Sequence, residues 1–302
     1  MAIAGKACSV NRLDIICVGS AKYDTNARIA RLPLEDERIV TERIVNAAGG
    51  NANTAAASAA RQGVSVALCT VIGDDPAGDY ILGQMREYGI DSRYVIRREN
   101  VDTPQSVNIA CSDTASRFLI VVNSPAIEVE AVLDASPAWF HFDADGFKAA
   151  RTAIQSGRLK GRVSVDAGVA IGIDLRGVDL YAPTRERIIA DFGGSLEDAM
   201  RAAVANGAGE VVVTLGAEGS AILSCGVISY QPAYPVEVLS TLGAGDVFHG
   251  ALVAALVRDL PLGEAVRCAT VAAALSCRAL DGQSAIPTRA ELDRHLAGFT
   301  AP

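Results

Sequence analysis

In the stretch Ser240-Thr241-Leu242-Gly243-Ala244-Gly245-Asp246-Val247-Phe248-His249-Gly250, a glycine-rich turn runs directly into an apolar helical pattern at 251–257. The first turn of a helix leaves backbone N–H groups without partners and carries partial positive charge. A Gly-Ala-Gly turn at this place therefore lets an anion approach the backbone closely. Asp246 is unexpected there because a carboxylate repels an anion, unless it accepts a proton from the group that attacks that anion. The local pattern alone is equally compatible with Asp246 acting as a helix cap.

The overall charge limits the kinds of partner that the chain can bind. The 302 residues carry a formal net charge of −8, and half of them are hydrophobic. Sequence-independent binding to nucleic acid or to an anionic membrane needs clustered positive charge, so we expect neither partner. The sequence contains no Gly-x-x-x-x-Gly-Lys-[Ser/Thr] phosphate loop, and no Gly-x-Gly-x-x-Gly turn follows its first predicted strand. An anionic ligand must therefore be held by local features such as the turn before Asp246.

The cysteines and the hydropathy pattern indicate a soluble cytoplasmic protein. Seven cysteines are scattered, mostly inside apolar runs, and no Cys-x-x-Cys pair is present. This usage is typical of buried thiols in a reducing compartment. No apolar run approaches the ~18 residues that a membrane-spanning helix needs, and the N-terminus lacks a long apolar signal segment.

Most of the chain alternates between predicted strands and predicted helices. The first strand candidate is the short apolar run 13–19, which ends in glycine, as buried parallel strands often do. The alternation predicts an α/β fold with a mainly parallel sheet covered by helices on both faces. The further strand candidates are 64–73, 139–142, 163–166, 179–182, 211–215 and 221–223, and the helical stretches are 55–61, 79–88, 147–157, 185–191, 195–207, 247–258, 263–279 and 288–297.

Two segments near the N-terminus and one later hairpin predict a small separate sheet. Residues 25–33 and 35–45 alternate apolar and polar side chains, the pattern of strands with one face in water. Residues 106–110 and 118–122 are predicted to pair as a hairpin. We expect the hairpin to complete the sheet that the first two segments begin.

Three further motifs lie beside the carboxyl ends of predicted strands or before a helix, where open α/β sheets bind ligands. Asp24 follows the first strand. A Gly49-Gly50-Asn51-Ala52-Asn53 turn precedes a helix of very small residues, and ligand binding is as compatible with it as ordinary turn chemistry. The loop 214–219 carries two glycines that could admit a base or a phosphate, although a hairpin turn into 221–223 is slightly favoured. His141 and His249 lack partners at metal-ligand spacing, so we expect packed or solvated side chains.

These motifs occur together, and in the same order, in the ribokinase-like (PfkB) family of carbohydrate kinases, which the sequence resembles over essentially its whole length. The signature 242–250 is the most specific of them. The resemblance implies a single domain over 1–302 with a three-layer, doubly wound, mainly parallel α/β sheet, and a small β-sheet lid formed by about 22–45 and 94–123. The motifs that carry it are Val18-Gly19-Ser20 with Asp24, the segment 27–37, the turn 49–53, Thr214-Leu215-Gly216, the signature 242–250 and Gly282-Gln283-Ser284-Ala285-Ile286-Pro287-Thr288.

The resemblance also implies a reaction, the in-line transfer of the γ-phosphoryl of ATP to a hydroxyl of a small sugar or sugar acid. Asp246 would be the general base, with Mg²⁺ bridging the phosphates and no metal ligand of the chain identified. A homodimer through the lid is expected, because lids in this family often pair between subunits. The other implied site residues are Gly243, Ala244 and Gly245, whose N–H groups would stabilise the transferring phosphoryl; Asp24, Gly50, Asn51 and Asn53, which would bind the acceptor's hydroxyls; and Thr214, Gly216 and Gly219, which would line the ATP site.

Three departures from the family's pattern concern the metal ions and the acceptor. Ser240 stands where the family usually has an aspartate that contributes to a monovalent-cation site, so we expect little activation by potassium. The family's Asn-x-x-Glu, associated with phosphate and Mg²⁺, falls near 184–187, where neither position matches and only the neighbouring Glu186 is acidic. Asn51 and Lys22 replace a usual small residue and a usual asparagine on the acceptor side, which leaves the identity of the sugar open.

Two other functions fit the same fold. A nucleoside kinase would need aromatic or apolar surface for a base, and only 5% of the residues are aromatic. A catalytically weak relative that binds a ligand as a sensor is favoured by the missing Asn-x-x-Glu and disfavoured by the complete glycine turn at Asp246.

Overall fold

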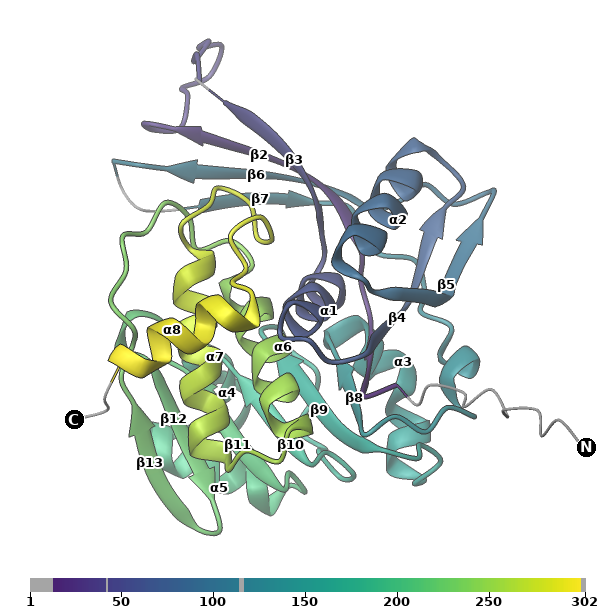
Figure 1. Cartoon of the computed structure of the whole chain (residues 1–302), viewed down its shortest axis with the longest axis vertical. Helices are drawn as coiled ribbons and strands as arrows, with labels where there is room; N and C mark the ends of the chain where they lie inside the picture. The colour runs from purple at the N-terminus through teal and green to yellow at the C-terminus, as the bar shows by residue number, and fades with distance from the viewer. Residues whose placement is uncertain (1–12, 42, 114–116, 300–302) are drawn as a thin grey trace, which may run out of the picture.

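Strands of the described chain form two separate sheets, a large one in the body of the molecule and a small one across one end (Figure 1). The computed structural model describes residues 13–41, 43–113 and 117–299. The large sheet has the order β13-β12-β11-β10-β9-β8-β1-β4-β5. Its strands are β1 (Ile15–Val18), β4 (Val66–Gly73), β5 (Asp91–Arg98), β8 (Trp139–Phe142), β9 (Arg162–Ala167), β10 (Leu180–Pro183), β11 (Glu210–Thr214), β12 (Ser220–Ser224) and β13 (Val227–Gln231).

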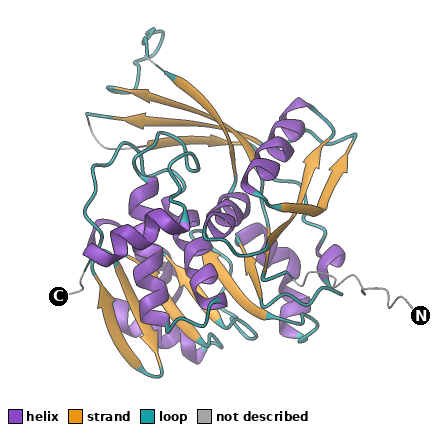
Figure 2. Ribbon diagram, viewed as in Figure 1, coloured by secondary structure: helices purple, strands orange, loops and turns teal. Residues whose placement is uncertain are grey.

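The large sheet is parallel from β5 to β11 and ends in two antiparallel strands, β12 and β13. Helices cover both of its faces (Figure 2). They are α1 (Asn51–Arg61), α2 (Pro76–Tyr88), α3 (Ala144–Gln155), α4 (Arg185–Phe192), α5 (Leu196–Ala205), α6 (Ala244–Val257), α7 (Leu262–Ser276) and α8 (Arg289–Gly298), with short 3₁₀ turns η1 (Val129–Val132) and η2 (Gly216–Glu218). The predicted three-layer, doubly wound α/β fold is therefore confirmed.

Alternate residues of the central strand β1 supply two hydrophobic cores. Ile15 and Cys17 belong to the core under α1, α6 and α7, whereas Ile16 and Val18 belong to the core under α3 and α5. Successive side chains of a strand point to opposite faces, so a fully apolar run is what a strand buried on both faces requires. The apolar run 13–19 thus becomes the middle of the sheet.

The small sheet has the order β3-β2-β6-β7, and we call it the lid sheet. Its strands are β2 (Lys22–Ile29), β3 (Ile44–Gly49), β6 (Gln105–Cys111) and β7 (Arg117–Val121). The predicted hairpin at 106–110 and 118–122 is present as β6 and β7.

Two predicted boundaries of the lid are corrected. Most of the predicted strand 35–45 is a loop, because Glu37 accepts hydrogen bonds from Arg31 and from the Leu34 N–H and closes a local turn instead of pairing along a strand. In addition, β5 lies partly within the predicted lid range 94–123 but pairs with β4 in the large sheet. The lid sheet therefore takes its later strands from residues 105–121.

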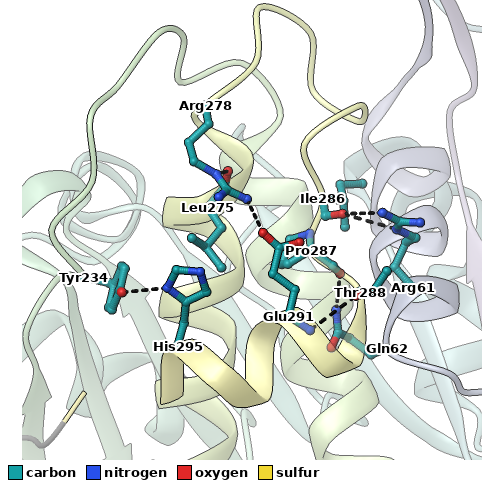
Figure 3. Close-up of polar contacts among 10 residues, drawn as sticks. All are labelled: Arg61, Gln62, Tyr234, Leu275, Arg278, Ile286, Pro287, Thr288, Glu291 and His295. Atoms are coloured by element: carbon teal, nitrogen blue, oxygen red, sulfur yellow. Dashed lines mark hydrogen bonds and ion pairs between the residues drawn. The ribbon is translucent and has the colours of Figure 1, made fainter. Parts of the chain in front are cut away.

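The last part of the chain is fastened across α1 (Figure 3). Arg61 and Gln62, at the end of α1, donate to the carbonyls of Ile286 and Pro287. Arg278 donates to Glu291 at 2.7 Å. These contacts hold the end of the loop 279–287 against the last turn of α1.

The cysteines agree in part with the sequence-based expectation of buried thiols. Five cysteines of the described chain are buried, but Cys225 is exposed because it lies in the turn between β12 and β13 with a φ of 49°; Cys8 lies outside the described residues. No helix in the described ranges is both long enough and apolar enough to cross a membrane.

Candidate active site

The site is built around the point where the order in which the chain adds strands to the large sheet reverses. From β1 the chain proceeds to β4 and β5 on one side, and then to β8 and β9 on the other, so the switch point lies between β1 and β8. Open α/β sheets bind ligands in the crevice at such a point. Ser20 follows β1 and Asp143 follows β8, and the Ser20 N–H and hydroxyl both donate to Asp143 Oδ2, at 2.7 and 2.8 Å.

Ser20 also anchors the predicted acceptor turn. Its hydroxyl accepts from the Asn51 N–H at 3.2 Å, and its carbonyl accepts from the Asn53 N–H at 3.2 Å. Gly50, the N-cap of α1, has a φ of 91°, and its Cα packs so closely that a Cβ would lie 2.6 Å from the Ser20 carbonyl oxygen. Only glycine fits this conformation and this contact, so the switch point fixes the start of α1.

Asp246 lies against this turn. The Asn51 Nδ2 donates to Asp246 Oδ1 at 2.7 Å, which joins the start of α1 to the start of α6. Helices α1 and α6 approach very closely, since a Cβ on Gly250 would lie 2.1 Å from the Ala55 carbonyl oxygen. The small residues of α1 thus bring the two motifs together. No capping bond from the Asp246 side chain occurs in α6, whose N-cap is Gly243, so the helix-cap interpretation of Asp246 is wrong.

The surroundings of Asp246 favour its protonated form more than water does. Part of the residue reaches solvent, but desolvation raises the pKa of Asp246 to about 7, and the negative charge of Asp166 adds to the rise. The hydrogen bond from Asn51 and the nearby His249 oppose this shift. A carboxylate with a pKa near neutrality is suited to general base catalysis.

A buried histidine–carboxylate pair lies beside Asp246. The Nε2 of His249, which follows Asp246 by three residues on α6, is 3.3 Å from Asp166 Oδ1 at the end of β9. Burial alone lowers the pKa of His249, but the charge and hydrogen bond of Asp166 outweigh it and the net shift is upward. Burial and the charge of His249 lower the pKa of His141, which stacks on it at 5.7 Å, to about 3. Both histidines are packed, as expected, and the Asp166–His249 pair lies close enough to Asp246 to act on its pKa.

The turn before α6 presents backbone N–H groups. Gly243 has a φ of 70°, and a Cβ on it would lie 2.7 Å from the Gly282 Cα, so both conformation and packing require glycine there. The Ala244 N–H donates to the Thr241 carbonyl at 3.3 Å. In the described part of the chain the N–H groups of Gly243 and Gly245 have no such partner, and space is open where a Gly245 Cβ would be. The turn therefore offers free donors to an anion.

On the predicted acceptor side, Asp24 lies on β2 at the inner face of the lid sheet. The Ser106 hydroxyl donates to Asp24 Oδ1 at 2.7 Å, and a Cβ on Gly49 would lie 1.8 Å from Asp24 Oδ2. Burial raises the pKa of Asp24 to about 6, while the bond from Ser106 and the charge of Lys22 lower it. The carboxylate is thus held firmly where β2 meets the turn 49–53.

Two asparagine oxygens next to Asp24 have no partner. Asn53 donates from Nδ2 to the carbonyls of Ala48 and Gly49, and Asn108 donates from Nδ2 to Asn26 Oδ1, but the Oδ1 atoms of Asn53 and Asn108 are buried without a hydrogen bond within the described chain. A buried acceptor left unpaired costs about 1–3 kcal/mol. Both atoms therefore retain unused hydrogen-bond acceptor capacity beside the predicted acceptor site.

The predicted nucleotide loop forms a hairpin, as the local pattern favoured. Strands β11 and β12 are antiparallel and joined by η2, and the Leu215 N–H donates to the Gly219 carbonyl at 2.8 Å. Thr214 ends β11 at the same edge of the sheet as Ser20 and Asp143, because the strands from β1 to β11 are parallel. Arg185, in the segment that departs from Asn-x-x-Glu, pairs with Glu218 at 2.7 Å and ties α4 to this loop.

The sequence matches a known protein family. The family model described as "pfkB family carbohydrate kinase" matches residues 12–161 and 175–289. The chain belongs to the pfkB family. It is a carbohydrate kinase, a phosphotransferase that acts on sugars. The predicted resemblance to this family is thereby confirmed.

Individual pfkB relatives are similar along nearly their full length. A ribokinase of Haemophilus influenzae is 24% identical over 297 residues, covering 93% of this chain and 97% of its own. A 5-dehydro-2-deoxygluconokinase of Shouchella clausii is 26% identical over 319 residues, covering 93% and 94%. The structure of Arabidopsis thaliana ribokinase complexed with ribose and ATP has a TM-score of 0.80 and 25% identity, covering 96% of this chain and 100% of that one.

The structure adds residues to the pfkB motifs that the sequence pattern did not single out. Ser106 and Asn108 reach Asp24 and Asn26 because β6 pairs with β2, a contact across about eighty residues of chain. Asp143 and Asp166 could have been found by the signal that marked Asp24, since each is an acidic residue at or just after the end of an apolar strand.

Proposed function

We propose that the chain transfers the γ-phosphoryl of ATP to a hydroxyl of a small sugar or sugar acid, with Asp246 as the general base. The observation that carries this proposal is the 2.7 Å hydrogen bond between Asn51 and Asp246. It joins the turn on the acceptor side to the turn with free N–H donors, so the carboxylate stands between the places of the two substrates. Its pKa of about 7 suits proton uptake at neutral pH.

The roles of the other residues follow from their atoms. Asp24 accepts hydrogen bonds from acceptor hydroxyls, as do the unpaired Oδ1 atoms of Asn53 and Asn108. Asn51 orients Asp246, and the backbone of Gly50 fixes the turn. The N–H groups of Gly243 and Gly245 stabilise charge on the transferring phosphoryl, and Ala244 contributes when its weak bond to Thr241 opens. The lid sheet closes over the acceptor and excludes water.

We propose that ATP binds with its base toward Thr214, Gly216 and Gly219, and with Mg²⁺ on its phosphates. Within the described residues no three His, Cys, Asp or Glu side chains converge as a metal site. An ion held mainly by phosphate oxygens and water needs no such cluster, and Mg²⁺ in phosphotransferases is usually held in this way. Bound Mg²⁺ neutralises phosphate charge, while the chain orients the two substrates and takes up the proton.

An ADP-release assay with a panel of sugars, sugar acids and nucleosides tests the proposal. We expect turnover with one group of sugars or sugar acids. If only nucleosides are turned over, the chain is instead a nucleoside kinase. Ligand-dependent melting shifts without turnover of any acceptor would instead indicate a binding protein that senses its ligand.

We expect no selective activation by potassium. The Ser240 hydroxyl accepts from the Leu242 N–H at 3.2 Å, and Arg117 of the lid sheet donates to the Thr241 carbonyl at 3.0 Å, so a fixed guanidinium stands beside the turn. These residues do not fit a monovalent-cation site. Replacing KCl with the same concentration of NaCl or choline chloride should leave kcat unchanged; a large rate increase specific to KCl would contradict this.

We also propose a homodimer through the lid sheet. Strand β7 is an unpaired edge of this sheet, and Phe118, Leu119, Ile120 and Val121 on it are 43–67% exposed. An apolar edge strand is a ready site for pairing with a second copy. Sedimentation velocity should give twice the mass of one chain for the wild type and a lower mass for Ile120→Lys; a wild-type monomer at micromolar concentration would refute the dimer.

A further inference from the structure

A groove of about 590 Å³ separates the outer end of the lid sheet from the loop 279–284. Its basic residues are Arg28, Arg43 and Arg278. The Arg278 guanidinium already has hydrogen-bond partners, since it donates to Glu291 and to the Leu275 carbonyl (Figure 3). Arg28 and Arg43 are exposed, and neither guanidinium forms an ion pair or hydrogen bond with another residue of the described chain.

The two free guanidinium groups line the same groove, Arg28 from β2 and Arg43 from the residue just before β3. Strands β2 and β3 are antiparallel, and their last registered pair is Ala27 with Ile44. Arg28 and Arg43 are the next residues along the two segments, and continuing the same register would place them opposite each other. Like charges that face each other across a strand pair destabilise a sheet, so this pair is favourable only if an anion joins it.

The groove and the proposed acceptor residues share strand β2. Asp24, Asn26 and Arg28 alternate along β2 and therefore share its inner face. At ~3.3 Å per residue, Arg28 follows Asp24 by about 13 Å, part of which the arginine side chain spans. Asp281 lines the groove, and its charge adds to the upward shift of the pKa of Asp24, which places the two carboxyl groups in the same neighbourhood. Both oxygens of Asp281 already accept bonds from Gln283 or Ser284.

We propose that Arg28 and Arg43 bind an oxyanionic group, a carboxylate or a phosphate ester, carried by the acceptor at the end remote from the hydroxyl that is phosphorylated. Guanidinium groups match both oxyanions with paired hydrogen bonds. Asp24, Asn53 and Asn108 then select the hydroxyls, and the arginine pair selects the charge. This inference rests on the proposed kinase function and narrows its substrate class to acidic sugars.

Steady-state kinetics on the full chain test this inference. Acceptors are supplied as matched sets of similar carbon skeleton: neutral pentoses and hexoses, the corresponding sugar acids, and the sugar monophosphates. The variants are Arg28→Ala and Arg43→Ala, with Arg158→Ala as an exposed control remote from the lid sheet. We expect the wild type to prefer one anionic set, and which set it prefers distinguishes a carboxylate from a phosphate.

For that anionic acceptor, each groove variant should raise KM by roughly 10- to 100-fold with a much smaller change in kcat, as expected for loss of a hydrogen bond to a charged group. The KM for neutral sugars should not change, and Arg158→Ala should behave as wild type. A wild type that turns over neutral sugars as efficiently as the anionic sets, or an unchanged KM for the anionic acceptor in both groove variants, would overturn the inference and leave the kinase function intact. Turnover of no acceptor in any of the three sets would overturn the proposed function itself.

Discussion

Asp246→Asn should lower kcat by about 10²- to 10⁴-fold, the usual contribution of a general base. The amide keeps an Oδ1 atom that can accept the bond from Asn51 Nδ2, so the turn and the fold should be preserved. What the variant loses is the ability to take up the proton of the acceptor hydroxyl. The measurement is ADP release at saturating ATP and acceptor, together with the melting temperature. A variant with wild-type kcat would refute the assigned role.

The pH dependence of the same variant provides a sharper control. Since desolvation and Asp166 raise the pKa of Asp246 to about 7, the wild-type kcat/KM for the acceptor should fall as the pH drops below about 7 and the base becomes protonated. The residual activity of Asp246→Asn should lack this decline. Asp145→Asn, which changes an exposed aspartate in the first turn of α3, should keep both the rate and the profile of the wild type.

Asp24→Asn should lower kcat/KM for the acceptor by roughly 10- to 100-fold, mainly through KM. A hydrogen bond to a charged group contributes about 1.5–3 kcal/mol, and the amide can accept the bond from Ser106 but cannot accept two hydroxyl donors as the carboxylate does. Steady-state kinetics with varied acceptor measure the effect. Unchanged KM would show that Asp24 does not contact the acceptor.

The stability of the Asp24 variant separates binding from folding. Burial raises the folded-state pKa of Asp24 to about 6, above the ~3.9 of an unfolded aspartate. The stability that the neutral carboxyl provides is thus complete below about pH 4 and is lost as the pH rises through about 6. Asp24→Asn does not titrate, so its melting temperature should rise relative to that of the wild type as the pH increases over this range. Asp113→Asn, an exposed change at the outer end of the lid sheet, should show neither effect.

Much of the fold was predictable because its signals are local. Each signal reflects what burial or backbone conformation requires at that point in the chain. The examples are the apolar run at 13–19, the small residues of 55–61 and the glycine turn before 247. The prediction failed at 35–45, where an alternating pattern suggested a strand but the ion pair of Arg31 and Glu37 closes a turn. An ion pair between side chains six residues apart favours a turn over a strand, and the alternation of apolar and polar residues does not reveal it.

The contacts of the candidate site were less predictable because they join distant segments. Asn51 and Asp246 are 195 residues apart in sequence, and their contact depends on how closely α1 and α6 pack. The pairing of Ser106 with Asp24 depends on the register of β2 with β6, which no local pattern specifies. The same applies to Arg28 and Arg43, which line one groove because β2 pairs with β3.

The sequence by itself determined the α/β fold class, the glycine turn at the start of α6 and the kind of residue at each motif, because backbone conformation and burial are set by the residues at each position. Only the tertiary structure decided that Asp246 is bound by Asn51 rather than capping its helix, that Asp166 pairs with His249, and that two free guanidinium groups share one groove. Those outcomes depend on strand register and helix packing between remote segments, which arise from the whole core rather than from any one stretch.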